Sequence, residues 1–441
     1  MTIAEPDLAL ATALFDRLRE QSFDGVGVTR DSYGAGEQRA HRLVADAARA
    51  LELQVATDAA LNLYLTLPGT DRGAAAVMTG SHLDSVPRGG NFDGAAGVVA
   101  GLAVLAGWRK AGFVPRRDVT VAAIRAEESA WFPVSYAGSK AAFGLLEPQA
   151  LDSVRADTGR SLADHMREAG GRPDDVRAGQ AHLRAERIDC FVELHIEQGP
   201  VLLEAGDVVG IVTGICGSQR YRHARVQGAY AHSGATPRSH RQDAVVATAA
   251  LIHALQQDWI ALEAQGHELT LTFGRCMTDP DQADFSKVAG LVEFSIDMRS
   301  RSRATLDLMD ARVHAAAAGI GTQHHVQVDL GAPSSSAAAQ MDPSLRHALL
   351  CSASRGGVRA RAMPSGAGHD AALFAAQGIP AAMIFVRNAH GSHNPNESMD
   401  LADFAIATRL LAGTLAARAG QAACSTTCGT THIAIHNTPH A

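Results

Sequence analysis

Four short apolar segments, each followed directly by polar residues, constrain the fold more than any other feature of the chain. They are residues 74–79, 119–124, 190–194 and 382–386. Their length and their content of Val, Ile, Phe and Ala are typical of strands that are buried on both faces. Helical periodicity is predicted between them, for example at residues 94–112, and near the amino terminus at residues 7–20 and 37–52. Strands that alternate with helices predict an α/β fold with a mostly parallel sheet.

Potential metal ligands come just after these apolar segments. They are His82, Asp93, Glu128, His195 and His393. In an open α/β sheet, ligands bind beyond the carboxyl ends of the strands, so these side chains are expected to meet at one edge of the sheet. Taken singly, each is more often an ordinary polar residue or part of a turn. Together, in the same topological position, they indicate a metal centre and hydrolytic chemistry.

This set of ligands is large enough for two divalent ions, which need a bridging carboxylate and terminal imidazole or carboxylate ligands. Asp93 lies in a glycine-rich turn that lets the backbone approach a cation, so it is the predicted bridge. His82 and His195 would complete one site, and Glu128 and His393 the other. Mixed sites of this kind accept Zn, Mn, Co or Ni, so the sequence predicts two divalent ions without choosing the metal.

Two further carboxylates neighbour the predicted ligands. Asp84, two residues after His82, is placed to orient an imidazole from behind. Glu127 precedes Glu128, and neighbouring side chains at a strand end point in different directions, so Glu127 can face a water molecule and act as general base. The alternative for Glu127 and Glu128 is a solvated acidic pair at the start of a loop.

The chain length favours two domains, because 441 residues are too many for one ordinary core. From about residue 214 the predicted order is a strand at 220–227, a helix at 243–265, strands at 269–275 and 291–299, a helix at 304–318 and a strand at 324–330. This βαββαβ order is that of a ferredoxin-like domain. The predicted division is a catalytic domain of residues 1–213 and 331–420, an inserted domain of residues 214–330, and a tail of residues 421–441 without ordered structure.

Composition excludes several classes of protein. A net charge of −7 without a Lys/Arg cluster argues against a nucleic-acid partner. The sequence shows no secretion signal and no uninterrupted run of about 18 apolar residues, so we expect a cytoplasmic protein without a membrane partner. The six cysteines are mostly far apart, as reduced core residues are. In the tail, Cys424, Cys428, His432 and His436 recur every fourth residue, a spacing too short for a zinc finger, and we expect a frayed end there.

Longer motifs surround the predicted ligands. They are Gly80-Ser-His82-Leu-Asp84-Ser-Val-Pro, Gly90-Asn-Phe-Asp93-Gly94, Glu127-Glu128, Leu194-His195-Ile-Glu-Gln198, Ser365-Gly-Ala-Gly-His369-Asp370 and Gly391-Ser-His393-Asn-Pro395-Asn-Glu397. With them the chain resembles the M20 metallopeptidase superfamily from about Gly25 to Glu397. Within that superfamily it resembles the amidase branch of N-carbamoyl-L-amino-acid hydrolases, β-ureidopropionases and allantoate amidohydrolases. The peptidase branch commonly has a carboxylate where this chain has His195, so a peptide substrate is disfavoured.

The resemblance implies roles for residues that the spacing alone does not single out. The inserted domain would be a lid and dimerisation domain, in which His232 stabilises the oxyanion and Arg299 binds a substrate carboxylate. Further substrate contacts would come from Gln198, Ser365, Gly366 and His369. Without the resemblance, His232 is a turn histidine and Arg299 a surface charge at a strand end, and residues 365–369 form a glycine-rich turn that caps a helix.

The chain departs from the family pattern at two places. Where the family usually has Glu-Glu-Gly-x-Arg-Phe, this chain has Ser129 for the glycine and Trp131 for the arginine. We expect a less polar pocket there. Ser286 stands where the family usually has an asparagine that can contact substrate. Because of these departures the sequence does not determine the identity of the substrate, although all the predicted metal ligands are present.

The predicted function is that of a homodimeric two-metal amidohydrolase that cleaves the terminal ureido C–N bond of an N-carbamoyl amino acid and releases ammonia and carbon dioxide. Allantoate amidohydrolase is the nearest alternative, because allantoate also carries ureido groups beside a carboxylate. A metallo-exopeptidase or aminoacylase, and a catalytically silent binding dimer, are the remaining alternatives.

Overall fold

The computed structural model describes residues 4–420, and within them the chain forms two compact units. Unit 1 holds the described residues up to Val212, together with Met341–Met363 and the described residues from His369 onward; unit 2 holds Thr213–Gln340 and Pro364–Gly368. The return to unit 1 comes ten residues later than the predicted boundary at 330/331. The reason is β14 (Pro333–Ser336), which pairs with a strand of unit 2. The Cys/His motif of the tail lies outside the described residues.

Unit 1 is built on a mixed sheet whose central strands are parallel. From one edge the order is β1 (Gln54–Thr57), β2 (Leu63–Leu67), β4 (Val119–Ile124), β3 (Ala76–His82), β5 (Ile188–Ile196), β17 (Ala381–Val386) and β6 (Val209–Ile215). β16 (Ala360–Ser365) also pairs with β6. β4, β3, β5 and β17 run parallel to their neighbours in this group, and they contain the predicted apolar segments. The α/β prediction is therefore confirmed, and the carboxyl ends of these strands share one edge of the sheet.

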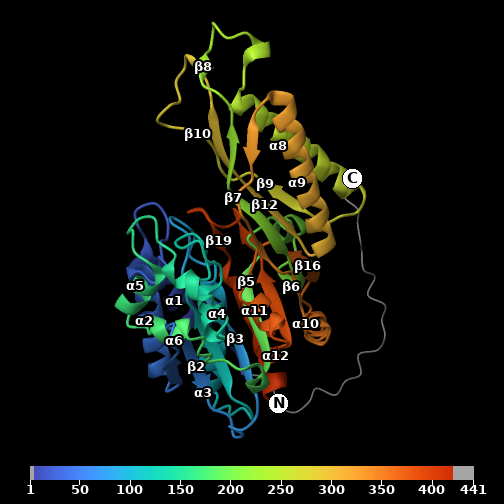
Figure 1. The fold of residues 1–441 in the computed structure, drawn as a ribbon. Helices are drawn as coiled ribbons and strands as arrows, with labels where there is room; N and C mark the ends of the chain where they lie inside the picture. Colours follow the sequence, from blue (N-terminus) through green and yellow to red (C-terminus); the bar gives the residue numbers. More distant parts are fainter. Residues whose placement is uncertain (1–3, 421–441) are drawn as a thin grey trace. The chain divides into compact units, whose positions relative to one another are not determined.

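Helices cover both faces of this sheet (Figure 1). Along β5, Val192 and Leu194 belong to the apolar core that α3 (Ala95–Lys110) and α12 (Leu401–Ala419) complete. Phe191, which precedes Val192 and points to the opposite face, stacks on Phe374 of α11 (Ala371–Ala376) with ring centroids 3.7 Å apart. Burial on both faces explains why these strands are continuously apolar in the sequence.

The remaining helices of unit 1 lie outside this central layer. They are α1 (Leu8–Ser22), α2 (Ala35–Ala50), α4 (Ala137–Ala142), α5 (Leu162–Glu168), α6 (Pro173–Arg177), α7 (Val201–Ala205) and α10 (Pro343–Arg355). α1 packs on α2 and α3, in agreement with the helical periodicity near the amino terminus.

The central helix α3 lies unusually close to the sheet. Its residues from Ala95 to Trp108 are all buried. A side chain at Gly97 would place its Cβ 2.3 Å from the backbone oxygen of Leu194 in β5, so only glycine allows this approach. The amino terminus of α3 is thereby held beside the carboxyl ends of β3 and β5, where its partial positive charge favours anions.

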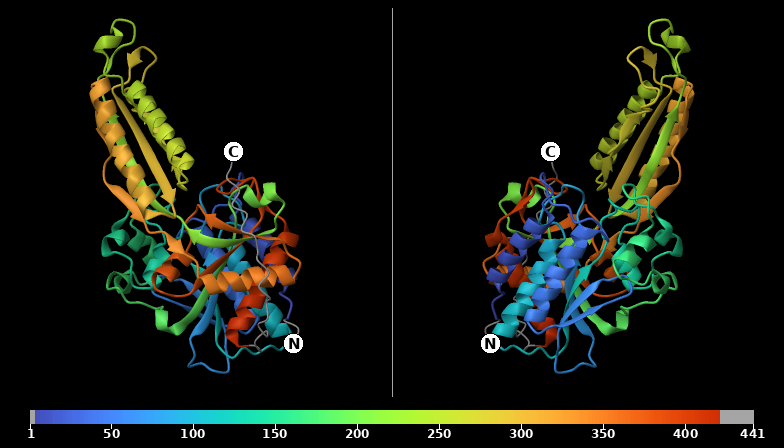
Figure 2. Two further views of the ribbon diagram at one scale, coloured as in Figure 1. Left: turned by 90° about the vertical axis from the view of Figure 1, so that its right-hand side faces the viewer. Right: turned by 90° about the vertical axis from the view of Figure 1, so that its left-hand side faces the viewer.

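Unit 2 has a separate antiparallel sheet. Its elements follow the predicted βαββαβ order, except that two short strands, β9 (Thr270–Thr272) and β10 (Cys276–Thr278), stand where one strand was predicted at 269–275. The other elements are β7 (Gly217–Gln227), α8 (Ala244–Ala264), β12 (Leu291–Ser300), α9 (Arg303–His324) and β13 (Gln327–Asp329). The sheet order is β10-β12-β7-β13, and the two long helices run along its strands (Figure 2). Two further short strands, β8 (Ala231–His232) and β11 (Lys287–Val288), pair with each other.

Several large apolar side chains of α8 are exposed. Asp243 caps the helix, and its inner residues Leu251 and Leu255 pack in the core of unit 2. Val246 and Ile260 are exposed by 51% and 53%. Among the described helices, α8 is the one whose length and composition would suit a membrane span, although only 28% of its most apolar window is buried. Its inner face packs as the face of a core helix does.

The contact at Gly97 predicts opposite effects for two glycine substitutions in helices. Gly97→Ala should lower the free energy of unfolding by about 1–3 kcal/mol, because the new methyl group forces α3 away from β5. Gly319→Ala, in α9 where a Cβ meets nothing within 4 Å, should raise it by up to about 1 kcal/mol. Urea denaturation of the metal-free protein measures both. Equal shifts in the two variants would contradict this account of α3.

Candidate metal centre

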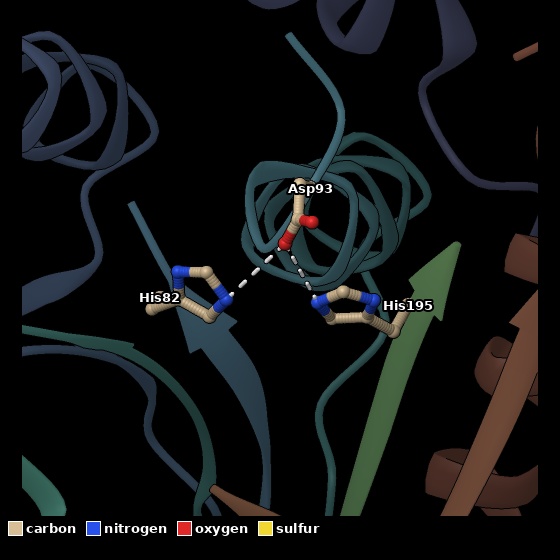
Figure 3. Close-up of side chains that lie close together, drawn as sticks. All are labelled: His82, Asp93 and His195. Atoms are coloured by element: carbon tan, nitrogen blue, oxygen red, sulfur yellow. Dashed lines mark ion pairs between the residues drawn. The ribbon is translucent and has the colours of Figure 1, made fainter. Parts of the chain in front are cut away.

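The structure brings three of the predicted ligands together at the carboxyl ends of β3 and β5. His82 is the last residue of β3, His195 lies near the end of β5, and Asp93 lies in the turn before α3. Oδ1 of Asp93 is 3.5 Å from Nε2 of His82 and 3.3 Å from Nε2 of His195, and all three side chains are buried (Figure 3). Their donor atoms are close enough to share one metal ion.

The other two predicted ligands meet the second oxygen of Asp93. Nε2 of His393 lies 3.6 Å from Oδ2 of Asp93 and 3.2 Å from Oε1 of Glu128. These three residues form a second group that could hold a metal ion. One carboxylate therefore faces two ligand sets with its two oxygens, which is the arrangement that a bridging ligand requires.

A direct indication that a cation belongs here is the state of Asp93. Its Oδ1 is buried and accepts no hydrogen bond from any residue between 4 and 420, although two imidazole nitrogens lie near it. A buried carboxylate oxygen without a donor is costly unless a cation neutralises it. The residues present thus fit a metal ion, with imidazole and carboxylate donors suited to Zn, Mn, Co or Ni.

The two histidines at the strand ends are oriented by acceptors behind them. Nδ1 of His82 lies 3.3 Å from Oδ1 of Asp84, and Nδ1 of His195 lies 3.0 Å from the backbone oxygen of Ile196. A proton on Nδ1 leaves Nε2 of each ring as the atom available to a metal. Gly94 makes room for the first ring, since its φ is +65° and a Cβ would lie 2.4 Å from Cε1 of His82.

Asp84 also fixes the backbone that carries Glu127 and Glu128. Its two carboxylate oxygens accept the N–H of Glu127 at 3.1 Å and the N–H of Glu128 at 3.2 Å. The same carboxylate therefore orients one predicted ligand, His82, and positions the predicted base and a second ligand. Oε2 of Glu127 lies 3.9 Å from Nε2 of His82, so the base faces the ligand group.

The centre is strongly anionic, and the pKa values show it. Burial, together with Glu128, raises the pKa of Glu127 well above its usual range, although His82 opposes this. Burial would lower the pKa of His82, but its interactions with Asp84 and Glu127 outweigh burial and raise that pKa well above normal. The hydrogen bond to Glu128 raises the pKa of His393 to about 9. Without a metal ion, the centre holds protons in the place of cations.

Ser392 and Glu397 contact the predicted bridge and were not singled out by the sequence. Oγ of Ser392 lies 2.5 Å from Oδ2 of Asp93 and 2.6 Å from Oε2 of Glu397. Oε1 of Glu397 accepts the N–H groups of Phe92 and Asp93. Both residues belong to the motif around His393, and that proximity was the only signal in the sequence.

Gln198 and His369, the predicted substrate contacts in unit 1, lie beside the ligands. Nε2 of Gln198 donates to Oδ2 of Asp93 at 2.7 Å, and its backbone has a φ of +65°. The ring of His369 packs edge-on against the ring of His195, with centroids 4.6 Å apart. His393 also has a positive φ, of +60°. Such backbone strain in residues with bulky side chains is common at functional sites.

The other predicted substrate contacts belong to unit 2. Arg299, in β12, donates from Nη1 to the backbone oxygen of Gly366 at 3.0 Å and is paired with Asp297. The hydroxyl of Ser365 donates to the backbone oxygen of Ala367 at 2.9 Å. The structure thus places Arg299 next to the segment 364–368.

His232 lies in an exposed turn of unit 2. Its Nδ1 accepts the N–H groups of Gly234 and Ala235, both at 3.1 Å. Because Nδ1 is an acceptor, Nε2 is the ring nitrogen that can donate a hydrogen bond. Ser286, one of the departures from the family pattern, is next to it, because its backbone oxygen accepts the N–H of Ser233.

Trp131, the other departure, has specific partners. Its indole N–H donates to the backbone oxygen of Ser85 at 2.7 Å, and the guanidinium of Arg155 lies 4.5 Å from the centroid of its ring. A cation is therefore present in the neighbourhood where a less polar surrounding was expected. Arg155 is itself paired with Asp31 and Asp157.

Comparison with known proteins assigns the family. The sequence profile of peptidase family M20/M25/M40 matches residues 78–417. The chain belongs to this family. It is 37% identical over 387 residues to an N-carbamoyl-L-amino acid amidohydrolase of Geobacillus stearothermophilus, which covers 87% of this chain and 92% of the relative. It is 34% identical over 363 residues to an allantoate amidohydrolase of Escherichia coli K12, with coverages of 82% and 85%.

A solved structure of a hydantoinase/carbamoylase family amidase from Burkholderia ambifaria is also similar, with a TM-score of 0.79 and 31% identity over 96% of this chain and 100% of that one. The predicted membership in the amidase branch of the M20 family is confirmed. The chain is a hydantoinase/carbamoylase family amidohydrolase that acts on carbon–nitrogen bonds other than peptide bonds, with candidate His, Asp and Glu metal sites.

Because the metal-free centre holds protons, its affinity for metal ions should depend on pH. Below a pKa of about 9, His393 is protonated, so a metal ion must displace that proton to bind. The apparent metal affinity should therefore rise as the pH rises toward about 9, and binding near neutral pH should release protons. Calorimetric titration of the metal in buffers of different ionisation enthalpy measures the number of protons released. An affinity that is the same at pH 6 and pH 9 would contradict this picture.

Proposed function

We propose that this M20 amidohydrolase binds two divalent ions and cleaves the terminal ureido C–N bond of an N-carbamoyl amino acid. The observation that carries the proposal is the position of Asp93, whose two oxygens each face one ligand group. The similarity to N-carbamoyl-L-amino acid amidohydrolase supports the substrate class. Two divalent ions bound here would polarise the substrate carbonyl and lower the pKa of a water molecule.

Glu127 is the proposed base. It is 9% exposed and faces the ligand group, and burial raises its pKa, so the carboxylate can accept a proton and keep it. It removes a proton from the attacking water and later delivers it to the terminal nitrogen as the C–N bond breaks. The products are ammonia and an N-carboxy amino acid, which loses carbon dioxide to give the free amino acid.

Residues of unit 2 are proposed to hold the substrate. His232 can donate from Nε2 to the developing oxyanion, because its Nδ1 already accepts two backbone hydrogen bonds. Arg299 offers a planar guanidinium to the carboxylate of the substrate. Gln198, Ser365, Gly366 and His369 are the proposed further contacts.

A homodimer through unit 2 is also part of the proposal. The support is the outer face of α8, where Val245, Val246 and Ile260 are exposed by 44–53%. Large apolar side chains that are exposed on a helix are typical of a surface that another protein covers. In a symmetric dimer, the same face would serve both subunits.

Allantoate is the second candidate substrate. The specific support is the 34% identity to the allantoate amidohydrolase of Escherichia coli. Allantoate also carries ureido groups next to a carboxylate, so the same base, oxyanion donor and arginine would serve.

The substrate is tested by removing metal with a chelator, reloading the protein separately with Zn, Mn, Co or Ni, and measuring ammonia release. We expect release from N-carbamoyl-L-amino acids in at least one metal form. N-carbamoyl-β-alanine and allantoate complete the panel. Preference for allantoate would select the second candidate, and silence toward every ureido compound in every metal form would contradict both.

The role of Glu127 predicts a separation of metal binding from turnover. Glu127→Gln keeps the size of the side chain but cannot accept a proton, so kcat should fall by about 10²–10⁴-fold. Metal content should be unchanged, because Glu127 is in neither ligand group. Glu168→Gln, at an exposed residue paired with surface Arg160, is the matched control and should behave as wild type. Near-normal turnover in metal-loaded Glu127→Gln would remove Glu127 from the mechanism.

A further inference from the structure

The segment between α1 and α2 contacts the turns that carry the predicted ligands, although it contains none of them. Arg30 is fully buried and donates to the backbone oxygen of Leu83 at 2.6 Å and to Oδ1 of Asn91 at 3.2 Å. The hydroxyl of Ser32 donates to Oδ2 of Asp84 at 2.7 Å. This segment and the start of α2 therefore lie directly behind the centre.

Glu37, in the first turn of α2, makes the most specific of these contacts. Its side chain is fully buried. Oε1 accepts the N–H of Ala126 at 3.0 Å, while Oε2 accepts the N–H of Tyr33 at 2.6 Å and Nη1 of Arg125 at 3.0 Å. The nearby His41 is no charge partner, because burial lowers its pKa well below the usual range. Glu37 is thus held by three donors and one positive charge.

Both backbone groups that Glu37 binds belong to residues in the left-handed region. Tyr33 has a φ of +53° and Ala126 a φ of +50°. Such conformations are unfavourable for residues other than glycine and persist only where surrounding contacts fix them. Ala126 is also the residue immediately before Glu127, so its conformation sets the direction in which the chain leaves β4.

The turn after β4 is held by two carboxylates in succession. The N–H of Ala126 goes to Glu37, and the next two N–H groups, of Glu127 and Glu128, go to Asp84. Asp84 cannot fix the bend at Ala126 by itself, because it contacts only the residues that follow the bend. The backbone oxygens of Ala126 and Glu127 accept the N–H groups of Ala137 and Tyr136. The contact from Glu37 is the one that fixes the N–H of Ala126, directly before the base and the ligand.

We infer that Glu37 is a positioning residue: through the N–H of Ala126 it sets the placement of Glu127 as base and of Glu128 as metal ligand. This inference rests on the proposed function for the role of Glu127, but its effect on Glu128 concerns metal binding alone. The substitution Glu37→Gln tests it, because the amide cannot accept at both ends. Two donors meet at Oε2 and one at Oε1, so the amide oxygen is expected at the Oε2 position, with the amide NH₂ opposed to the N–H of Ala126.

The expected result of Glu37→Gln is a fall of about 10–100-fold in the affinity for the metal ion that Glu128 and His393 hold. The ion held by His82 and His195 should bind within about threefold of wild type. With both sites saturated, kcat should fall by about tenfold or more while KM changes by less than about threefold. Asp189→Asn is the matched control, since Asp189 also accepts from arginines, Arg117 and Arg418, but lies at the opposite end of β5. It should leave metal affinity and turnover unchanged.

Glu37→Gln leaves Arg125 buried without its carboxylate, which can impair folding. The double variant Glu37→Met/Arg125→Met removes both charges and leaves the N–H of Ala126 without its side-chain acceptor, and it should show the same selective loss of metal affinity. Metal affinities within threefold of wild type at both sites in the folded double variant would overturn the inference. So would equal losses at the two sites, which indicate general destabilisation. If wild type releases no ammonia from any ureido compound, the proposed function fails while the metal titration still decides the role of Glu37.

Discussion

The centre depends on the placement of one carboxylate, that of Asp93, between two groups of ligands. Its backbone N–H is bound by Glu397, and the glycine that follows it leaves room for the ring of His82. Gln198 and Ser392 contact its Oδ2, while its buried Oδ1 is left without a hydrogen bond. Two features of unit 1 support this placement: α3 lies close to the sheet because of Gly97, and the parallel strands end at the same edge.

The same placement explains the electrostatics of the site. Several buried carboxylates lie near one another, and the histidines among them have raised pKa values despite their burial. Such an arrangement is expensive for a protein alone and is neutralised by cations. Burial in the same surroundings raises the pKa of Glu127. A carboxylate with a raised pKa can take a proton from one group and deliver it to another.

Much of the fold could be predicted because its signals are local. The apolar segments before His82, Glu128, His195 and His393 predict strands that are buried on both faces. Parallel neighbouring strands place their carboxyl ends at the same edge of the sheet. The contact of Glu37 with Ala126 could not be predicted, because 89 residues separate them and a glutamate in a helix is usually exposed. Arg30 is a similar case, since nothing in the sequence marks it as fully buried.

The boundary of unit 2 and the surroundings of Trp131 also could not be predicted, because both depend on tertiary contacts. The short strand Pro333–Ser336 has little apolar character, so its pairing with β7 depends on tertiary structure. Trp131 suggested a loss of positive charge, but Arg155, 24 residues further along, lies over its ring. In unit 2, by contrast, the strict alternation of buried residues along β12 and the apolar length of α8 made the element order predictable.

The most direct test of the account is anomalous diffraction from crystals of the protein loaded with manganese or zinc. The account predicts two peaks about 3.5–4 Å apart, with Asp93 between them. One peak should lie beside His82 and His195, and the other beside Glu128 and His393. A single peak, or two ions that do not share Asp93, would contradict the central claim.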